Sequence, residues 1–363
     1  MSHKVIIAIL SVLLVGVGGA WGYTVWQKQQ QELADARNAI AAAKQAEEDK
    51  RKQEELAAAQ AAEVAEPEVE QSPEELEAGP AFEYGYVSPD TPGYLKAFNF
   101  AQNNELWKSF PELSAVDGRF MLPRPLKLVT AECGNVNAFY SPDKTVVVLC
   151  YEMIHALLER GLALREANQF SEEFPIRYLQ ANLRFIVMHE VGHALVDLLD
   201  LPITGREEDA ADQLAGWMML KNVDTTESFG TLAMNMQMAA DFFAADSQQY
   251  GMQHYADVHS LGQQRFFNIQ CMIYGHDPAR FLRIVTSGNL PEDRAQGCPD
   301  ESERITNAWT ALMEPHLAPR YRLTPEQAEQ AEKAVAEQRR SLAAPYVSRP
   351  SSAADAAADA ATE

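Results

Sequence analysis

The segment from Phe174 to Leu199 constrains the fold of this 363-residue chain more than any other feature. Its apolar residues are not confined to one stripe, as they are in a surface helix. They surround the middle of the segment: Phe185, Ile186, Val187, Met188, Val191, Ala194, Leu195 and Val196. A helix that is apolar nearly all round is buried, and buried polar side chains need partners. The sequence therefore predicts a buried helix whose His and Glu residues have partners inside the protein.

The polar residues of this helix form the pattern His189-Glu190-Val191-Gly192-His193. Residues four apart project from one face of a helix, so both imidazoles can bind one metal ion. Glu190 lies between them and can act as general base toward a water molecule at an open coordination position. The alternative is an amphipathic helix with His and Glu on the protein surface. The apolar residues around them argue against this alternative. We expect His189 and His193 to bind Zn²⁺.

A catalytic zinc ion needs a third protein ligand. The residues Leu201–Gly205 predict a tight loop, and a second helix beginning after it can return antiparallel to the first. Glu208 and Asp212 share one face of that helix, a spacing that suits a ligand and a carboxylate that orients a ligand imidazole. Glu207 and Asp209 remain alternatives for the ligand, and acidic residues also favour a helix N-terminus. We expect Glu208 to bind the metal and Asp212 to orient a histidine.

This arrangement resembles the gluzincin type of zinc metallopeptidase, in which HExxH is completed by the Glu of a following ExxxD. The stretch from Cys133 to about Pro278 also resembles a bacterial metallopeptidase-like family catalogued as a domain of unknown function. The matching segments are Cys133-Gly134, Asn137-Ala138-Phe139-Tyr140, Leu149-Cys150-Tyr151-Glu152, His189 to Leu195, Gly205 to Asp212, His259-Ser260-Leu261 and Gln264-Arg265. The resemblance implies a zinc-dependent peptidase fold and names no substrate.

His259 follows the two metal helices in the sequence, where a zincin can supply a donor to the developing oxyanion. We expect the His259 imidazole to donate this hydrogen bond, with Tyr255 as the runner-up. The alternatives are structural: His259 could cap the helix that follows it or pair with Asp257.

The N-terminus predicts export. Residues Val5 to Trp26 carry no charge and are long enough to span a bilayer as a helix. A membrane anchor is favoured over a cleaved signal peptide, for which Gly18-Gly19-Ala20 is a passable cleavage site. Both alternatives place the rest of the chain outside the cytoplasm, periplasmic or extracellular, and the anchor places it on a bacterial inner membrane by a single pass.

Composition divides the exported part. After the anchor (residues 1–26), residues 27–81 are rich in Ala, Glu and Gln. They predict a solvated helical stalk to about residue 62, favoured over a coiled coil, and then a flexible linker. Residues 82–343 contain nearly all the Phe, Tyr, Cys and Met and form one domain, followed by a disordered tail at 344–363. The net charge of −22, without a basic stripe, argues against nucleic acid as a partner.

Four cysteines in an exported chain can form two disulfides. Of the three connectivities, we expect the one that joins sequence neighbours, Cys133–Cys150 and Cys271–Cys298. Four free buried thiols are the alternative.

The sequence of this domain predicts a zincin-like α+β fold with a small sheet and mostly helices. Short strands are expected at 126–131 and 145–149, and helices at 153–167, 174–199, 207–221, 226–246, 259–275, 302–315 and 324–342. The strand near 145–149 is a candidate edge for an extended peptide.

Together these features predict a membrane-tethered zinc peptidase that acts on peptides or proteins through a zinc-bound water. The alternative is a binding or scaffold protein that keeps the zinc or the fold without turnover. The sequence leaves the oligomeric state open.

Overall fold

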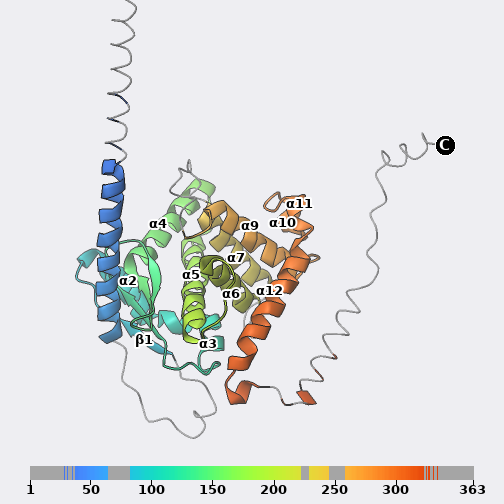
Figure 1. Cartoon of the computed structure of the whole chain (residues 1–363). Coiled ribbons are helices and arrows are strands. Elements are labelled where there is room, and N and C mark those ends of the chain that lie inside the picture. Colours follow the sequence, from blue (N-terminus) through green and yellow to red (C-terminus); the bar gives the residue numbers. More distant parts are fainter. Residues whose placement is uncertain are drawn as a thin grey trace, which may run out of the picture.

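The computed structural model describes residues 37–63, 82–221, 229–244 and 258–322, with single residues at 28, 31, 35, 324, 326, 327, 330 and 333 (Figure 1). The expected anchor, linker and tail lie outside the described residues, as does Tyr255. No helix within the described ranges is long and apolar enough to cross a bilayer. The described chain is α+β, as expected, with a small sheet on one side of a group of helices.

The sheet contains β1 (Glu83–Tyr86), β2 (Lys127–Ala131), β3 (Ala138–Ser141) and β4 (Val146–Cys150) in the order β1-β2-β4-β3. β1, β2 and β4 are parallel, whereas β3 pairs antiparallel with β4. The two expected strands are confirmed as β2 and β4. β1 and β3 were not expected from the sequence, because each has only four residues and little β-branched character.

The expectation that the strand at 145–149 forms an edge is wrong. All five residues of β4 are buried, because β4 pairs with β2 on one side and β3 on the other. The continuous Val146-Val147-Val148-Leu149 run is typical of a strand covered on both faces. The edge beside the helices is β3 instead.

Six of the expected helices are present within a few residues of their predicted bounds. They are α4 (Tyr151–Asn168), α5 (Phe174–Leu198), α6 (Glu207–Lys221), α7 (Phe229–Ala244), α9 (Gly262–His276) and α12 (Cys298–Met313). The helix expected at 324–342 lies almost wholly outside the described residues. The shorter elements are α2 (Leu95–Asn103), α3 (Pro111–Val116), α10 (Leu282–Thr286), α11 (Glu292–Ala295) and 3₁₀ turns at Pro92–Tyr94, Leu106–Ser109, Glu314–His316 and Pro319–Tyr321.

The helix α5 lies at the centre of the main core, as its sequence predicts. It packs against α4, α6 and α7 and against β3 and β4. Its residues from Leu183 to Val191 are all buried. The buried Arg184 guanidinium pairs with the buried carboxylate of Glu112 on α3, so this charge also has its partner.

The helix over 37–63 is not a solvated stalk along its whole length. Its last turns pack on the face of the sheet that the other helices leave open (Figure 1), and Ala57, Ala58 and Ala61 are at most 2% exposed. They contact a second apolar cluster made of Val129, Ala131, Cys133, Val146, Val148 and Cys150. The sequence suggested solvation because these contacts use alanines, which form no conspicuous apolar stripe. The small side chains allow a close approach of helix to sheet.

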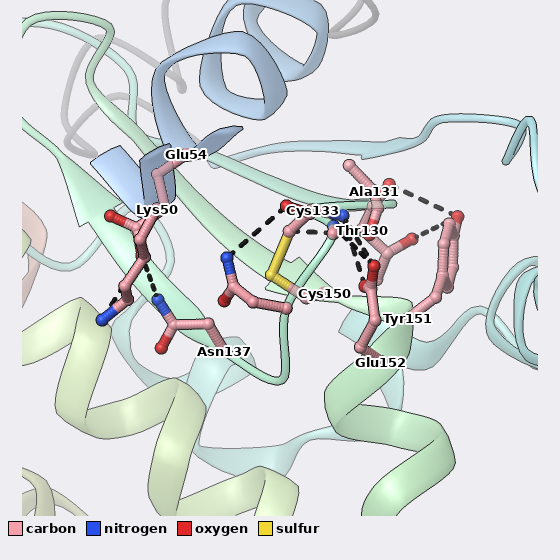
Figure 2. Close-up of a disulfide and its surroundings, with 11 residues drawn as sticks. Lys50, Glu54, Thr130, Ala131, Cys133, Asn137, Cys150, Tyr151 and Glu152 are labelled. Atoms are coloured by element: carbon pink, nitrogen blue, oxygen red, sulfur yellow. Dashed lines mark hydrogen bonds and ion pairs between the residues drawn. A yellow bond between two sulfur atoms is a disulfide. The ribbon is translucent and has the colours of Figure 1, made fainter. Parts of the chain in front are cut away.

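Both expected disulfides are present, and no cysteine is free. Cys133–Cys150 joins the loop after β2 to the end of β4 (Figure 2), and Cys271–Cys298 joins α9 to the start of α12. Two such cross-links are typical of proteins from an oxidising compartment.

Candidate metal centre

The close approach of α5 and α6 brings the candidate ligands together. The two helices lie close together at Gly192 and Ala211, where a Cβ on Gly192 would lie 3.3 Å from the Ala211 Cα and carbonyl oxygen. Glycine at this position of the motif therefore lets α6 approach the face of α5 that carries the histidines. Glu208, one turn before Ala211, is thereby placed opposite His189 and His193.

Three ligand atoms from these residues point to one position. The Nε2 atoms of His189 and His193 are 3.2 Å apart, and Glu208 Oε2 lies 3.2 Å from the first and 3.3 Å from the second. Donors of a single metal ion form such a small triangle. The structure thus brings together the expected set His189, His193 and Glu208.

The outer nitrogens of both imidazoles face carboxylates. His189 Nδ1 lies 2.8 Å from Asp212 Oδ1, and His193 Nδ1 lies 2.7 Å from Glu207 Oε1. When each Nδ1 carries the proton that these carboxylates accept, both Nε2 lone pairs face each other and the Glu208 oxygen. Three electron-rich atoms this close repel one another unless a proton or a metal cation lies between them. The arrangement fits a metal ion.

The charges of the site agree with this conclusion. Burial lowers the pKa of His189, but its contacts with Asp212 and Glu208 outweigh burial and raise the pKa to about 9. Burial raises the pKa of Glu208, but the three imidazoles around it hold the pKa far below its usual range. Both shifts have one cause: the carboxylates favour positive charge at the imidazole nitrogens, which a proton or a bound cation can supply.

Glu190 differs from the other acids. It is 9% exposed, and burial raises the pKa of its carboxyl group, although the neighbouring histidines and a hydrogen bond from the Tyr140 backbone act in the opposite direction. It borders the same cleft as the triangle without belonging to it. A carboxylate with a raised pKa beside an open metal position suits proton transfer.

Residues of the segment 259–265 contact three acidic residues of α6. His259 Nε2 lies 3.0 Å from Glu208 Oε2, and the Ser260 hydroxyl donates to Asp209 at 2.6 Å. Arg265 donates two hydrogen bonds to Asp212, at 2.8 and 2.7 Å. The suggestion that His259 caps the next helix is wrong, because the N-cap of α9 is Leu261.

Three of these contacts were not expected from the sequence. Glu207, weighed as an alternative ligand or as favourable charge at the helix N-terminus, contacts the outer nitrogen of His193. Asp209 faces Ser260 rather than the metal position. Ser260 and Arg265 belong to matching segments of the family resemblance, but nothing in their spacing assigned them to α6. The residues next to a basic side chain do not indicate which acidic residue, distant in the sequence, that side chain will contact.

A cleft of about 700 Å³ opens beside the triangle. The residues that line it come from β3, α5, the loop before α6, α6, the segment before α9 and, unexpectedly, the helix over 37–63. The site is therefore open to a ligand larger than water, along the exposed edge of the sheet.

The Asp212–Arg265 pair should strengthen metal binding. We expect Asp212→Ala to weaken the affinity for Zn²⁺ by about 10–100-fold, since the carboxylate that orients a ligand imidazole is lost. Arg265→Ala should weaken the zinc affinity less, because Asp212 then keeps its contact with His189 and loses only the two hydrogen bonds from Arg265. Competition with a chromophoric chelator measures both, and Arg283→Ala, an exposed arginine on α10, is the matched control. Wild-type affinity in Asp212→Ala would contradict this role.

Comparison with known families agrees with the geometry. Residues 86–313 match the model of a family described as "Putative metallopeptidase". The matched range includes β2, β3, β4 and every residue of the triangle. Searches of curated proteins and of solved structures find no match. With well over half of its length matched, the chain belongs to this metallopeptidase family.

Proposed function

We propose that this protein is a zinc-dependent peptidase. The observation that carries the proposal is the triangle formed by His189, His193 and Glu208. Zinc bonds nitrogen and carboxylate oxygen at about 2.0–2.2 Å, so neighbouring ligands of a tetrahedral ion lie about 3.3–3.6 Å apart. The separations of 3.2, 3.2 and 3.3 Å are close to the edges of one face of that tetrahedron. Three protein ligands leave the fourth position open, as catalytic zinc sites require.

Zinc held by His189, His193 and Glu208 would supply Lewis acidity to the scissile carbonyl and to the attacking water. The chain's own residues move the protons. Glu190 accepts a proton from the attacking water and passes it to the nitrogen of the departing amine. Its raised pKa makes the Glu190 carboxylate a stronger base toward the water, and the carboxyl group holds the proton between the two steps.

The substrate backbone would pair with β3. Within the described residues β3 has a neighbouring strand, β4, on one side, and its other side faces the cleft. An extended peptide can add there as a further strand. Ala138, Phe139 and Tyr140 line the cleft, and the Tyr140 backbone bonds to Glu190, so the scissile bond would lie beside Tyr140.

His259 is the proposed donor to the carbonyl oxygen as negative charge develops on it. Its side chain is 47% exposed and lines the cleft next to Glu208. We expect His259→Ala to lower kcat by about 10²–10³-fold. Zinc content and melting temperature should change little. Loss of zinc or stability in proportion to activity would make His259 structural, and an unchanged kcat would remove it from the site.

Metal analysis and peptide-library cleavage test the proposed function together. The purified chain should contain about one zinc per molecule and cleave peptides in a manner that chelation abolishes. A chain that binds zinc and cleaves no peptide would be the scaffold protein instead. We would then assign the triangle a structural role.

We also propose that the catalytic part is exported and stays attached to the membrane by residues 5–26. The two disulfides support an oxidising compartment. N-terminal sequencing of the mature protein from the membrane fraction tests the anchor. A soluble product that begins at Trp21 would show that the segment is a cleaved signal peptide.

A further inference from the structure

The helix over 37–63 is fixed beside the substrate edge of the sheet. Near its C-terminal end, the Lys127 ammonium group donates to the Ala62 carbonyl at 2.8 Å. Two turns earlier, Glu54 Oε1 accepts a hydrogen bond of 2.7 Å from the Asn137 side chain (Figure 2). Asn137 directly precedes β3. The helix therefore has a defined register against the strand that borders the cleft.

The loop between β2 and β3 also contacts the helix over 37–63. Gly134 has a φ of +78° and approaches Gln53 of the helix so closely that a Cβ would lie 3.0 Å from its side chain. The buried Glu152 carboxylate accepts hydrogen bonds from the Cys133 and Gly134 amides (Figure 2). The disulfide from Cys133 fixes this loop to β4. Helix, loop and edge strand thus form one connected wall.

The part of this wall that faces the cleft carries an available cation. Lys50 lines the cleft, its side chain is 48% exposed, and its ammonium group lies 3.7 Å from Glu54. Glu54 itself makes the shorter bond to Asn137. The other acids that line the cleft have roles already: Glu207 and Glu208 contact histidines, and Glu190 is buried. A carboxylate entering the cleft near Lys50 would find a weakly engaged ammonium group.

The strand direction indicates which part of a substrate reaches Lys50. A peptide that pairs antiparallel with β3 runs from Ser141 toward Ala138. With its scissile bond beside Tyr140, the residues after that bond lie toward Asn137 and hence toward Glu54 and Lys50. The helix therefore contacts the C-terminal side of the substrate.

We propose that the helix over 37–63 is a wall of the substrate cleft and that Lys50 binds a carboxylate of the peptide on the C-terminal side of the scissile bond. The proposal rests on the peptidase function proposed above. The carboxylate can belong to an acidic side chain or to the free C-terminus of a short substrate. Both sources offer the same two oxygens to the ammonium group.

Matched peptides test the proposal in the full chain loaded with zinc. One pair carries Glu or Gln at the second residue after the cleaved bond, and a second pair has a free or an amidated C-terminus. The wild type should prefer the carboxylate member of at least one pair by about three- to tenfold in kcat/KM. Lys50→Gln should reduce that preference to about one, chiefly by lowering kcat/KM for the carboxylate member. Lys52→Gln, the same charge change at an exposed position outside the cleft, is the matched control.

Peptide affinity measured on the Glu190→Gln background gives a second readout that does not depend on turnover. There the carboxylate peptide should bind more tightly than its neutral twin when Lys50 is present, and the two should bind equally after Lys50→Gln. A preference that survives Lys50→Gln, or that Lys52→Gln removes equally, would overturn the role of Lys50. No preference in the wild type would also overturn it. Absence of any Glu190-dependent cleavage would refute the peptidase function itself, and the role of Lys50 with it.

Discussion

Replacing Glu190 with Gln is expected to lower kcat for peptide cleavage by about 10²–10⁴-fold while the protein keeps its metal. The amide has nearly the shape of the carboxyl group but cannot accept the proton of the attacking water. Glu190 lies outside the triangle of ligand atoms, so zinc affinity should remain near that of the wild type. Metal analysis of the purified variant and its cleavage rate on one library-selected peptide measure the two quantities.

Controls separate this effect from a general disturbance. Glu159→Gln makes the same change on the exposed face of α4 and should leave cleavage unchanged. His189→Ala and Glu208→Ala should instead lose metal and activity together, because each removes a ligand. Equal cleavage by the wild type and Glu190→Gln would exclude the proposed peptidase mechanism.

The second large effect concerns stability. Ala58 is 1% exposed where the helix over 37–63 packs on the sheet. Ala58→Glu must bury an unpaired carboxylate there or separate the helix from the sheet, and either should lower the free energy of unfolding by about 3 kcal/mol or more. Separation would also expose the apolar cluster of Val129, Ala131, Val146 and Val148. Chemical denaturation followed by circular dichroism measures the loss.

Ala43→Glu is the matched control, since Ala43 lies on the exposed half of the same helix and should tolerate the charge. A chain that begins at residue 82 makes the same test by truncation. It should be less stable than the full chain and prone to aggregate, because an exposed apolar sheet face favours association. Wild-type stability of Ala58→Glu would show that the helix contributes little to the fold.

The triangle of His189, His193 and Glu208 was predictable because its signals are local. His189 and His193 are spaced by one helical turn, and Glu208 and Asp212 repeat that spacing on a helix joined by a short loop. Two helices connected in this way have few arrangements, so the sequence alone indicates which faces meet. The six helices found near their expected bounds follow for the same reason, since their apolar periodicity is contained within each segment.

The contributions from distant parts of the chain were not predictable. β3 has the sequence Ala-Phe-Tyr-Ser, and nothing in these residues shows that it forms the edge beyond β4. Arg265 meets Asp212 across 53 positions, and Asn137 meets Glu54 across 83. Alanine-rich segments are especially ambiguous, because Ala suits both a solvated helix and a close contact with a sheet.

The exposed half of the helix over 37–63 also sets a length. An α-helix rises about 1.5 Å per residue, so the position of Lys50 is about 20 Å along the axis from residue 37. A helix keeps the distance between its two ends fixed, whereas the end-to-end distance of a disordered tether varies. With the proposed anchor in the membrane and the helix continued to it, cleavage would favour peptide segments displayed at one distance from the bilayer, and lengthening the helix by whole turns would move that distance outward.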